Sequence, residues 1–277
     1  MGFRVSTNIA AINAQRTLNG SQRAIQKSMG QMSSGSRINA AADDAAGLAI
    51  SENLKAQIRS ARQANRNASD GISLVQTAEG GLNEISNIIV RLRELGIQAA
   101  SDTIGDTERG FLNKEVSQLK EEVQRIASVT TWGSTKLLNG ESPKFDFQVG
   151  IHNNDIEDRI SFDSSVNVAT LDALGLADLD FTSKEGAQSS LSSLDNAQTN
   201  VNGMRANLGA LQNRLTSTVD NLGVSEENLS AANSRIRDTD IAQASAEMTR
   251  NSILLNASTS TLTQANQVNQ LALKLIG

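Results

Sequence analysis

Side chains that could carry out chemistry are few in this sequence. It contains one histidine, His152, and no cysteine. A single histidine beside a run of Asn and Asp cannot supply a histidine-based metal site, and it is more typical of a solvated loop than of a general base. Without cysteine there is no thiol nucleophile, thiolate ligand or disulfide. We therefore expect neither a metal nor a cofactor.

The neighbouring carboxylates Asp43 and Asp44 are the remaining candidates for acid–base chemistry. Adjacent residues at a helix start point in different directions, so we interpret the pair as a helix cap and a first-turn carboxylate. The glycines within helical segments lack the preceding strand that a phosphate-binding loop requires. The sequence predicts no catalytic residue and a protein that is not an enzyme.

The composition favours long helices over one thick globular core. Of 277 residues, 38% are hydrophobic and 3% aromatic, and the single proline is Pro143. Little therefore interrupts a helix, and few large side chains are available to fill a core. The formal charge is −5 with dispersed basic residues, which argues against a nucleic-acid or anionic-membrane partner. No apolar run reaches the ~18 residues that span a bilayer, and the start of the chain lacks the apolar segment of a cleaved signal peptide.

Two long segments carry apolar residues at seven-residue spacing. One series predicts a coiled-coil helix whose start is capped by Thr182 or Ser183. Its members are Leu194, Val201, Leu208, Leu215, Leu222, Leu229 and Ile236. A matching series, interrupted near Gly80, predicts a helix over about 44–99, and a third helix follows the polar turn at 101–106. Residues 131–181 hold most of the aromatic residues, and the alternation at 145–149 and 160–162 predicts a small β-hairpin.

The two chain ends, 1–33 and 239–277, read as amphipathic helices that need partners. Burying about eight large apolar residues of the first end gives at most ~12–24 kcal/mol, whereas fixing that backbone costs ~30–60 kcal/mol. We predict that both ends are largely disordered in the monomer and become ordered when subunits assemble. The residues expected to make the polymerisation contacts are Ile9, Ile12, Leu18, Ile25, Met29, Met32, Met248, Leu255, Leu262, Val268, Leu271 and Leu275.

Several motifs in a fixed order resemble those of bacterial flagellins. The first is Met32-Ser-Ser-Gly-Ser-Arg-Ile-Asn, which continues through Asp43-Asp44 to Ser51. Further matches occur at 70–85, 91–95, 147–150 and 262–267, so the resemblance spans nearly the whole chain.

The resemblance implies a mainly α fold, with a long coiled-coil helix bundle, a small β-hairpin region and terminal helices that pair antiparallel. The implied domains are an inner-tube domain of 1–33 with 239–277, a spoke linker of 34–43, and an outer-tube domain of 44–238 with the hairpin at about 131–181. Only about twenty residues separate hairpin and last long helix, which indicates a minimal form without outer variable domains.

The resemblance also implies function and partners. We expect a structural subunit that polymerises into the flagellar filament, the helical propeller of swimming motility. The expected partners are other copies of the chain, an export chaperone, and the hook-associated junction and cap proteins. The expected location is extracellular, in the filament, after export without a cleaved signal peptide.

One binding site follows residue by residue from the resemblance. Arg91, Leu95 and Glu115 match positions by which the vertebrate Toll-like receptor for flagellin recognises some family members. Explanations without a receptor remain open: Arg91 and Glu115 are solvated or subunit-bridging charges, and Leu95 lies on the helix seam.

Two other functions compete with the filament subunit. A hook-filament junction protein shares the terminal helices and the Ser-Gly-x-Arg-Ile motif, but such proteins tend to have Pro after the Asp-Asp pair, where this chain has Ala45. A generic intracellular coiled-coil adaptor would leave the ordered motifs unexplained. Self-polymerisation separates the adaptor from the filament subunit.

Overall fold

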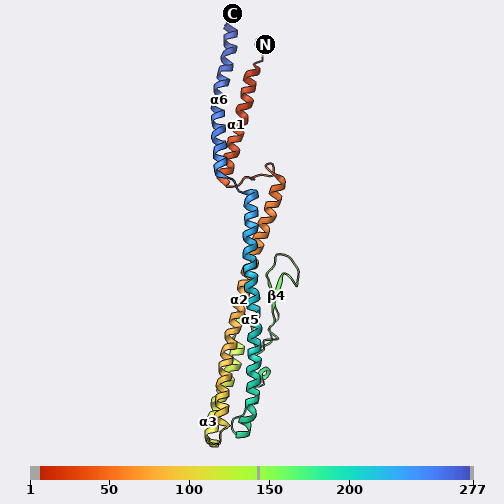
Figure 1. Ribbon diagram of the computed structural model, residues 1–277, viewed down its shortest axis with the longest axis vertical. Helices are drawn as coiled ribbons and strands as arrows, with labels where there is room; N and C mark the ends of the chain where they lie inside the picture. Colours follow the sequence, from red (N-terminus) through yellow and green to blue (C-terminus); the bar gives the residue numbers. More distant parts are fainter. Residues whose placement is uncertain (1–6, 142–143, 275–277) are drawn as a thin grey trace. The chain divides into compact units, whose positions relative to one another are not determined.

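The computed structural model describes residues 7–141 and 144–274, with side chains described as far as Gln267. Long helices dominate this part of the chain, as predicted (Figure 1). The helices are α1 (Ile9–Ser34), α2 (Ala45–Ala99), α3 (Asp106–Val129), α4 (Leu171–Leu174), α5 (Lys184–Arg237) and α6 (Ile241–Lys274). The strands are β1 (Thr131–Trp132), β2 (Thr135–Lys136), β3 (Phe145–Gln148) and β4 (Arg159–Phe162).

The chain divides into two compact units. The terminal unit comprises Met1–Gln57 with Asn228–Gly277, and the central unit comprises Ile58–Glu227. The divisions between the units fall inside α2 and α5, whereas the domain boundaries predicted from the sequence lie at helix ends. That three-part domain division remains a prediction.

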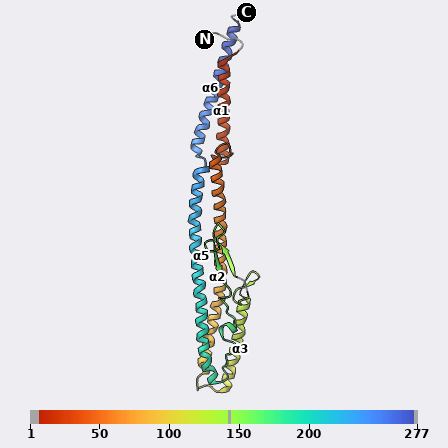
Figure 2. The same ribbon diagram turned by 90° about the vertical axis from the view of Figure 1, so that its right-hand side faces the viewer.

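The terminal unit is built on the antiparallel pair of α1 and α6 (Figures 1 and 2). Asn8 caps α1, because its side-chain oxygen accepts from the Ala11 N–H over 3.0 Å. The Asn8 amide also donates to the Ala265 carbonyl oxygen near the far end of α6, over 3.0 Å. Since the start of one helix meets the end of the other, the predicted antiparallel pairing is confirmed.

The central unit is built on α2 and α5, which also run antiparallel. Residues of the predicted seven-residue series on α5 are fully buried, namely Leu194, Val201, Leu208 and Leu215. Ion pairs of one antiparallel register link the two helices, from Arg62 to Glu226 at 2.6 Å and from Arg93 to Asp195 at 2.7 Å. The apolar series therefore supplies the burial, and the charges favour one register.

The α3 helix folds back beside α2 (Figure 2), and a buried arginine holds the turn between them. Arg109 is 7% exposed, and its guanidinium donates to the carbonyl oxygens of Ala99 and Ser101, each over 2.9 Å. Its third partner is the Asp106 carboxylate at 2.8 Å. Arg109 thus satisfies carbonyl groups that the end of α2 leaves without helical partners.

The predicted β-hairpin is formed by β3 and β4, in which Phe145 lies opposite Phe162 with ring centroids 6.0 Å apart. The hairpin packs on α2, since the Asn67 amide donates to the Gln148 carbonyl oxygen over 2.9 Å. The sequence did not predict the short pair β1–β2 or the four-residue helix α4, because such short elements carry no measurable period. Within the described part of 130–183 there is no further domain, in agreement with a minimal form.

Candidate assembly surface

The junction between α1 and α2 is held by the backbone at the end of α5 and just after it. Gly35 ends α1 with φ +70°, a left-handed conformation that favours glycine. Its carbonyl oxygen accepts from the Thr239 N–H over 2.9 Å, and the Arg37 N–H donates to the Arg237 carbonyl oxygen over 2.6 Å. The Arg37 guanidinium donates to the Ile236 carbonyl oxygen over 2.8 Å, which caps the end of α5.

Ile38 anchors the same junction through burial. It is 2% exposed, and a Cβ atom on Gly47 would lie 2.8 Å from its Cδ1 atom. A side chain at Gly47 would also lie 2.4 Å from Oδ2 of Asp44, which caps α2 by accepting from the Gly47 N–H over 2.8 Å. The motif glycine therefore lets Ile38 and the cap close over the first turn of α2.

Asp43 lies outside α2 and Asp44 caps it, so the prediction of a cap at Asp43 followed by a first-turn carboxylate is wrong by one residue. The helix begins at Ala45, and Asp43 instead closes the preceding turn by accepting from the N–H groups of Asn39 and Ala40, each over 3.2 Å. Its carboxylate also pairs with Lys27 of α1 at 3.1 Å. The Lys27 ammonium first, and then the two backbone N–H groups, hold the pKa of Asp43 below its ordinary value.

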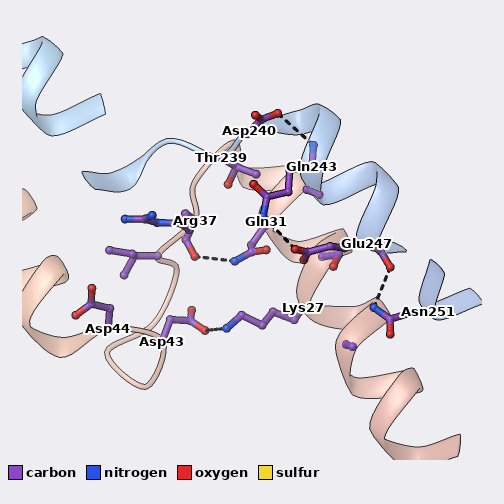
Figure 3. Close-up of a pocket in the computed structure, with 14 residues that line it drawn as sticks. Lys27, Gln31, Arg37, Asp43, Asp44, Thr239, Asp240, Gln243, Glu247 and Asn251 are labelled. Carbon is purple, nitrogen blue, oxygen red and sulfur yellow. Dashed lines mark hydrogen bonds and ion pairs between the residues drawn. The ribbon is translucent and has the colours of Figure 1, made fainter. Parts of the chain in front are cut away.

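A polar pocket of about 520 Å³ lies between α1, α6 and this junction (Figure 3). Lys27 reaches across to Asp43, and the Gln31 amide donates to the Arg37 carbonyl oxygen over 2.8 Å. From α6, Gln243 donates to Glu247 over 3.2 Å. Among the described residues, no group of three His, Cys, Asp or Glu side chains could hold a metal ion. The ion pair and the Gln31 hydrogen bond instead connect α1 to the segment that follows it.

Small side chains make the contact between α1 and α6. Among the described side chains, the buried residues of α1 are Ala14, Ser21 and Ser28, seven positions apart, and those of α6 are Ala244 and Ser258, fourteen positions apart. Small residues allow close helix approach, but they bury little apolar area. The pairing therefore leaves large apolar side chains of both helices exposed, among them Ile12 and Ile253.

The predicted polymerisation residues divide between exposed and half-buried positions of the helix pair. Ile9, Ile12 and Met29 are more than half exposed. The half-buried members are Leu18, Ile25, Met32, Met248, Leu255 and Leu262. The side chains of Val268 and Leu271, and the whole of Leu275, lie outside the described residues. The predicted set omits further exposed apolar residues on α6, among them Ile253, which is 64% exposed, and Leu254, which is 41% exposed.

The three residues of the predicted receptor site divide into two environments. The Arg91 guanidinium pairs with Glu115 at 2.9 Å and with Glu94 at 3.0 Å, and all three side chains are exposed. Both carboxylates raise the pKa of Arg91, with the Glu94 hydrogen bond as the larger cause. Leu95 is 1% exposed and belongs to the core. Arg91 and Glu115 are thus brought together at the surface, with Leu95 beneath.

Sequence reasoning also missed the roles of Arg37 and Ile38, although both lie in the first motif. They lie about 200 positions before the end of α5, and no sequence pattern predicted a contact over that separation.

Among the helices of the described residues, none combines the length and the apolar character needed to span a membrane.

Comparison with known proteins agrees with this architecture. The model of the bacterial flagellin N-terminal helical region matches residues 5–142, and that of the C-terminal helical region matches residues 191–276. A flagellin of Halalkalibacterium halodurans is 43% identical over 98% of this chain and 99% of its own length. A flagellar filament core protein of Brachyspira hyodysenteriae is 42% identical, with the same two shares covered. The crystal structure of Bacillus cereus flagellin has a TM-score of 0.51 and 28% identity, and covers 57% of this chain and 88% of that one. The chain belongs to the bacterial flagellin family.

Proposed function

We propose that this chain polymerises into the flagellar filament, the helical propeller of swimming motility, through the outward apolar surface of α1 and α6. The observation that carries the proposal is the exposure of large apolar side chains on a helix pair whose own contact uses small residues. Ile9, Ile12 and Ile253 are 59%, 51% and 64% exposed. Each such side chain contributes ~1.5–3 kcal/mol when fully buried, so neighbouring copies supply stabilisation that one copy lacks.

Ordering of the chain ends would then be coupled to assembly. The α1–α6 contact alone buries too little apolar area to offset the conformational entropy of two long helices. In the monomer both ends would be largely disordered, and in the filament both would be helical. Dispersed, well-protected amide signals from residues 7–33 in dilute monomer would contradict this coupling.

The partners and location follow from the filament role. The subunit would be exported to the outside of the cell, where it would join a growing filament attached through hook-associated junction proteins and covered by a cap protein. An export chaperone would hold the apolar chain ends before secretion. Two relatives that match 98% of the chain are a flagellin and a filament core protein, which favours a filament subunit over a junction protein. Their structural role also supports a chain without catalytic activity.

A second interaction is supported by the surface around Arg91. Together with Glu115, it would contact the Toll-like receptor for flagellin in free subunits, while the buried Leu95 would support the helix beneath them. Exposure of the ion pair and its match to the family positions support this role.

Complementation of a flagellin-deficient bacterium tests the filament role. The unaltered chain and Ile253→Val should restore filaments and swimming, because both keep an apolar side chain at the exposed site. Ile253→Asp should restore neither, although its level in the cell and its helical content stay unchanged. Filaments of normal length from Ile253→Asp would overturn the assigned surface, and short stubs from the unaltered chain would favour the junction protein.

A further inference from the structure

Three Asn–Gly pairs occur in the chain, and they lie in different backbone environments. Asn19–Gly20 lies within α1, Asn202–Gly203 lies within α5, and Asn139–Gly140 lies in a bend between β2 and β3. An Asn side-chain carbonyl carbon can be attacked by the backbone nitrogen of the next residue. Glycine obstructs this attack least, since it has no side chain. The local backbone therefore decides which pair reacts.

A helix prevents the attack. It holds ψ of the asparagine at about −42°, and the N–H of the following glycine donates to a carbonyl oxygen four residues earlier. Closing a five-membered ring would require the ψ angle to rotate and the glycine N–H to give up its helical hydrogen bond. Gly203 meets nothing within 4 Å of an added Cβ, so it is the helical backbone, and not crowding, that protects Asn202.

The bend at Asn139, unlike the two helices, has a backbone that leaves the attack open. The Asn139 side-chain oxygen accepts from the Glu141 N–H over 3.1 Å, and its amide nitrogen donates to Glu141 Oε2 over 2.6 Å. Gly140 has φ +76°, and among the described residues its N–H has no assigned acceptor. Both residues are partly exposed, so water reaches them. The amide is thus oriented, and its nearest nucleophile is free.

We propose that Asn139 is a site of self-modification through a cyclic imide. The Gly140 nitrogen loses its proton and forms a bond to Cγ of Asn139, and negative charge develops on Oδ1, where the Glu141 N–H stabilises it. The bond from Cγ to Nδ2 then breaks, and the nitrogen leaves as ammonia with the proton returned. Water opens the imide at either carbonyl, which yields aspartate or isoaspartate at position 139.

The product would alter the local structure. A new carboxylate would lie beside Glu141, which pairs with Lys136 at 3.8 Å. Isoaspartate would also lengthen the backbone next to Leu138, which is fully buried and whose carbonyl oxygen accepts from the Ala169 N–H over 2.9 Å. Modification should therefore loosen the attachment of the bend.

Peptide mapping by mass spectrometry, with detection of isoaspartate, tests the proposal. The folded full-length protein and the same protein in urea are incubated at mildly alkaline pH. In the folded protein Asn139 should react at least about tenfold faster than Asn202, a difference of about 1.4 kcal/mol in activation free energy. In urea the two should react at similar rates, and Asn139→Gln should give no product at that position.

Either of two results would overturn the proposal. One is an unreacted Asn139 in folded protein under conditions where both sites react in urea. The other is equal reaction at Asn139 and Asn202 in folded protein. Asn19 is followed separately, because α1 is proposed to become ordered only on assembly.

Discussion

The guanidinium of Arg37 donates to the carbonyl oxygen of Ile236 over 2.8 Å, which joins two segments separated by 199 positions in sequence. The Arg37 backbone N–H adds a second bond, to Arg237. These contacts cap α5 and fix the segment between α1 and α2 at the junction from which α6 begins. The first sequence motif therefore joins the segment after α1 to the end of α5, and we call these Arg37 contacts the clasp.

Arg37→Ala should weaken this junction. Loss of one charge-assisted hydrogen bond at an exposed site costs about 1 kcal/mol, and residues 34–44 should lose protection from amide hydrogen exchange. Arg235→Ala is the matched control, since Arg235 lies in the last turn of α5 and has no assigned hydrogen bond or ion pair within the described residues. Equal effects of the two variants would show that the clasp has no special role.

Gly150→Ala should destabilise the β-hairpin. An added Cβ would lie 1.7 Å from Oδ1 of Asp158, so the turn must shift, at a cost of about 1–3 kcal/mol. The control Gly203→Ala should instead stabilise by about 0.8–1 kcal/mol, because Gly203 lies inside α5 with open space around it. Thermal unfolding of the two variants measures both changes, and a Gly150→Ala protein as stable as the unaltered chain would contradict the geometry.

The long elements could be predicted from sequence because burial imposes a period. The series from Leu194 to Ile236 is apolar at every seventh residue, and its first four members belong to the buried core that also contains residues of α2. The cap of α5 was also predictable, since the Ser183 side chain accepts from the Gly186 N–H over 3.1 Å.

The contact of α1 with α6 could not be predicted in this way. Its buried residues include Ser21, Ser28 and Ser258. Because serine is polar, these positions add nothing to a hydrophobic period in the sequence. The larger apolar residues carry the visible period, but those such as Leu18 and Leu255 are half-buried, so the period alone does not separate contacts within the chain from contacts between copies. Arg37 and Ile38 were equally hidden, because their contacts depend on chain segments far apart in sequence.

Arg91→Ala and Leu95→Ala should affect different properties of the protein. Arg91→Ala should leave unfolding nearly unchanged, since its ion pairs are exposed, but it should lower the response of cells that carry the flagellin receptor. Leu95→Ala removes a fully buried side chain and should cost about 2–5 kcal/mol of stability. An unchanged receptor response to folded Arg91→Ala monomer would argue against the proposed surface.

The Asp43 turn should be sensitive to acid. Because the pKa of Asp43 is lowered in the folded chain, its stabilising contribution is fully present above its unfolded pKa of about 3.9. That contribution is lost as the pH falls through the lower, folded value. Amide exchange of Asn39 and Ala40 should therefore accelerate below about pH 4, whereas in Asp43→Asn this step should be absent and the turn weaker at neutral pH.

The most direct test of assembly through the chain ends is electron microscopy of seeded, salted protein, comparing the full chain with a version lacking residues 1–33 and 239–277. The full chain should form long filaments, and the truncated version should remain soluble, monomeric and helical by circular dichroism. Filaments from the truncated version would contradict the assignment of assembly to α1 and α6.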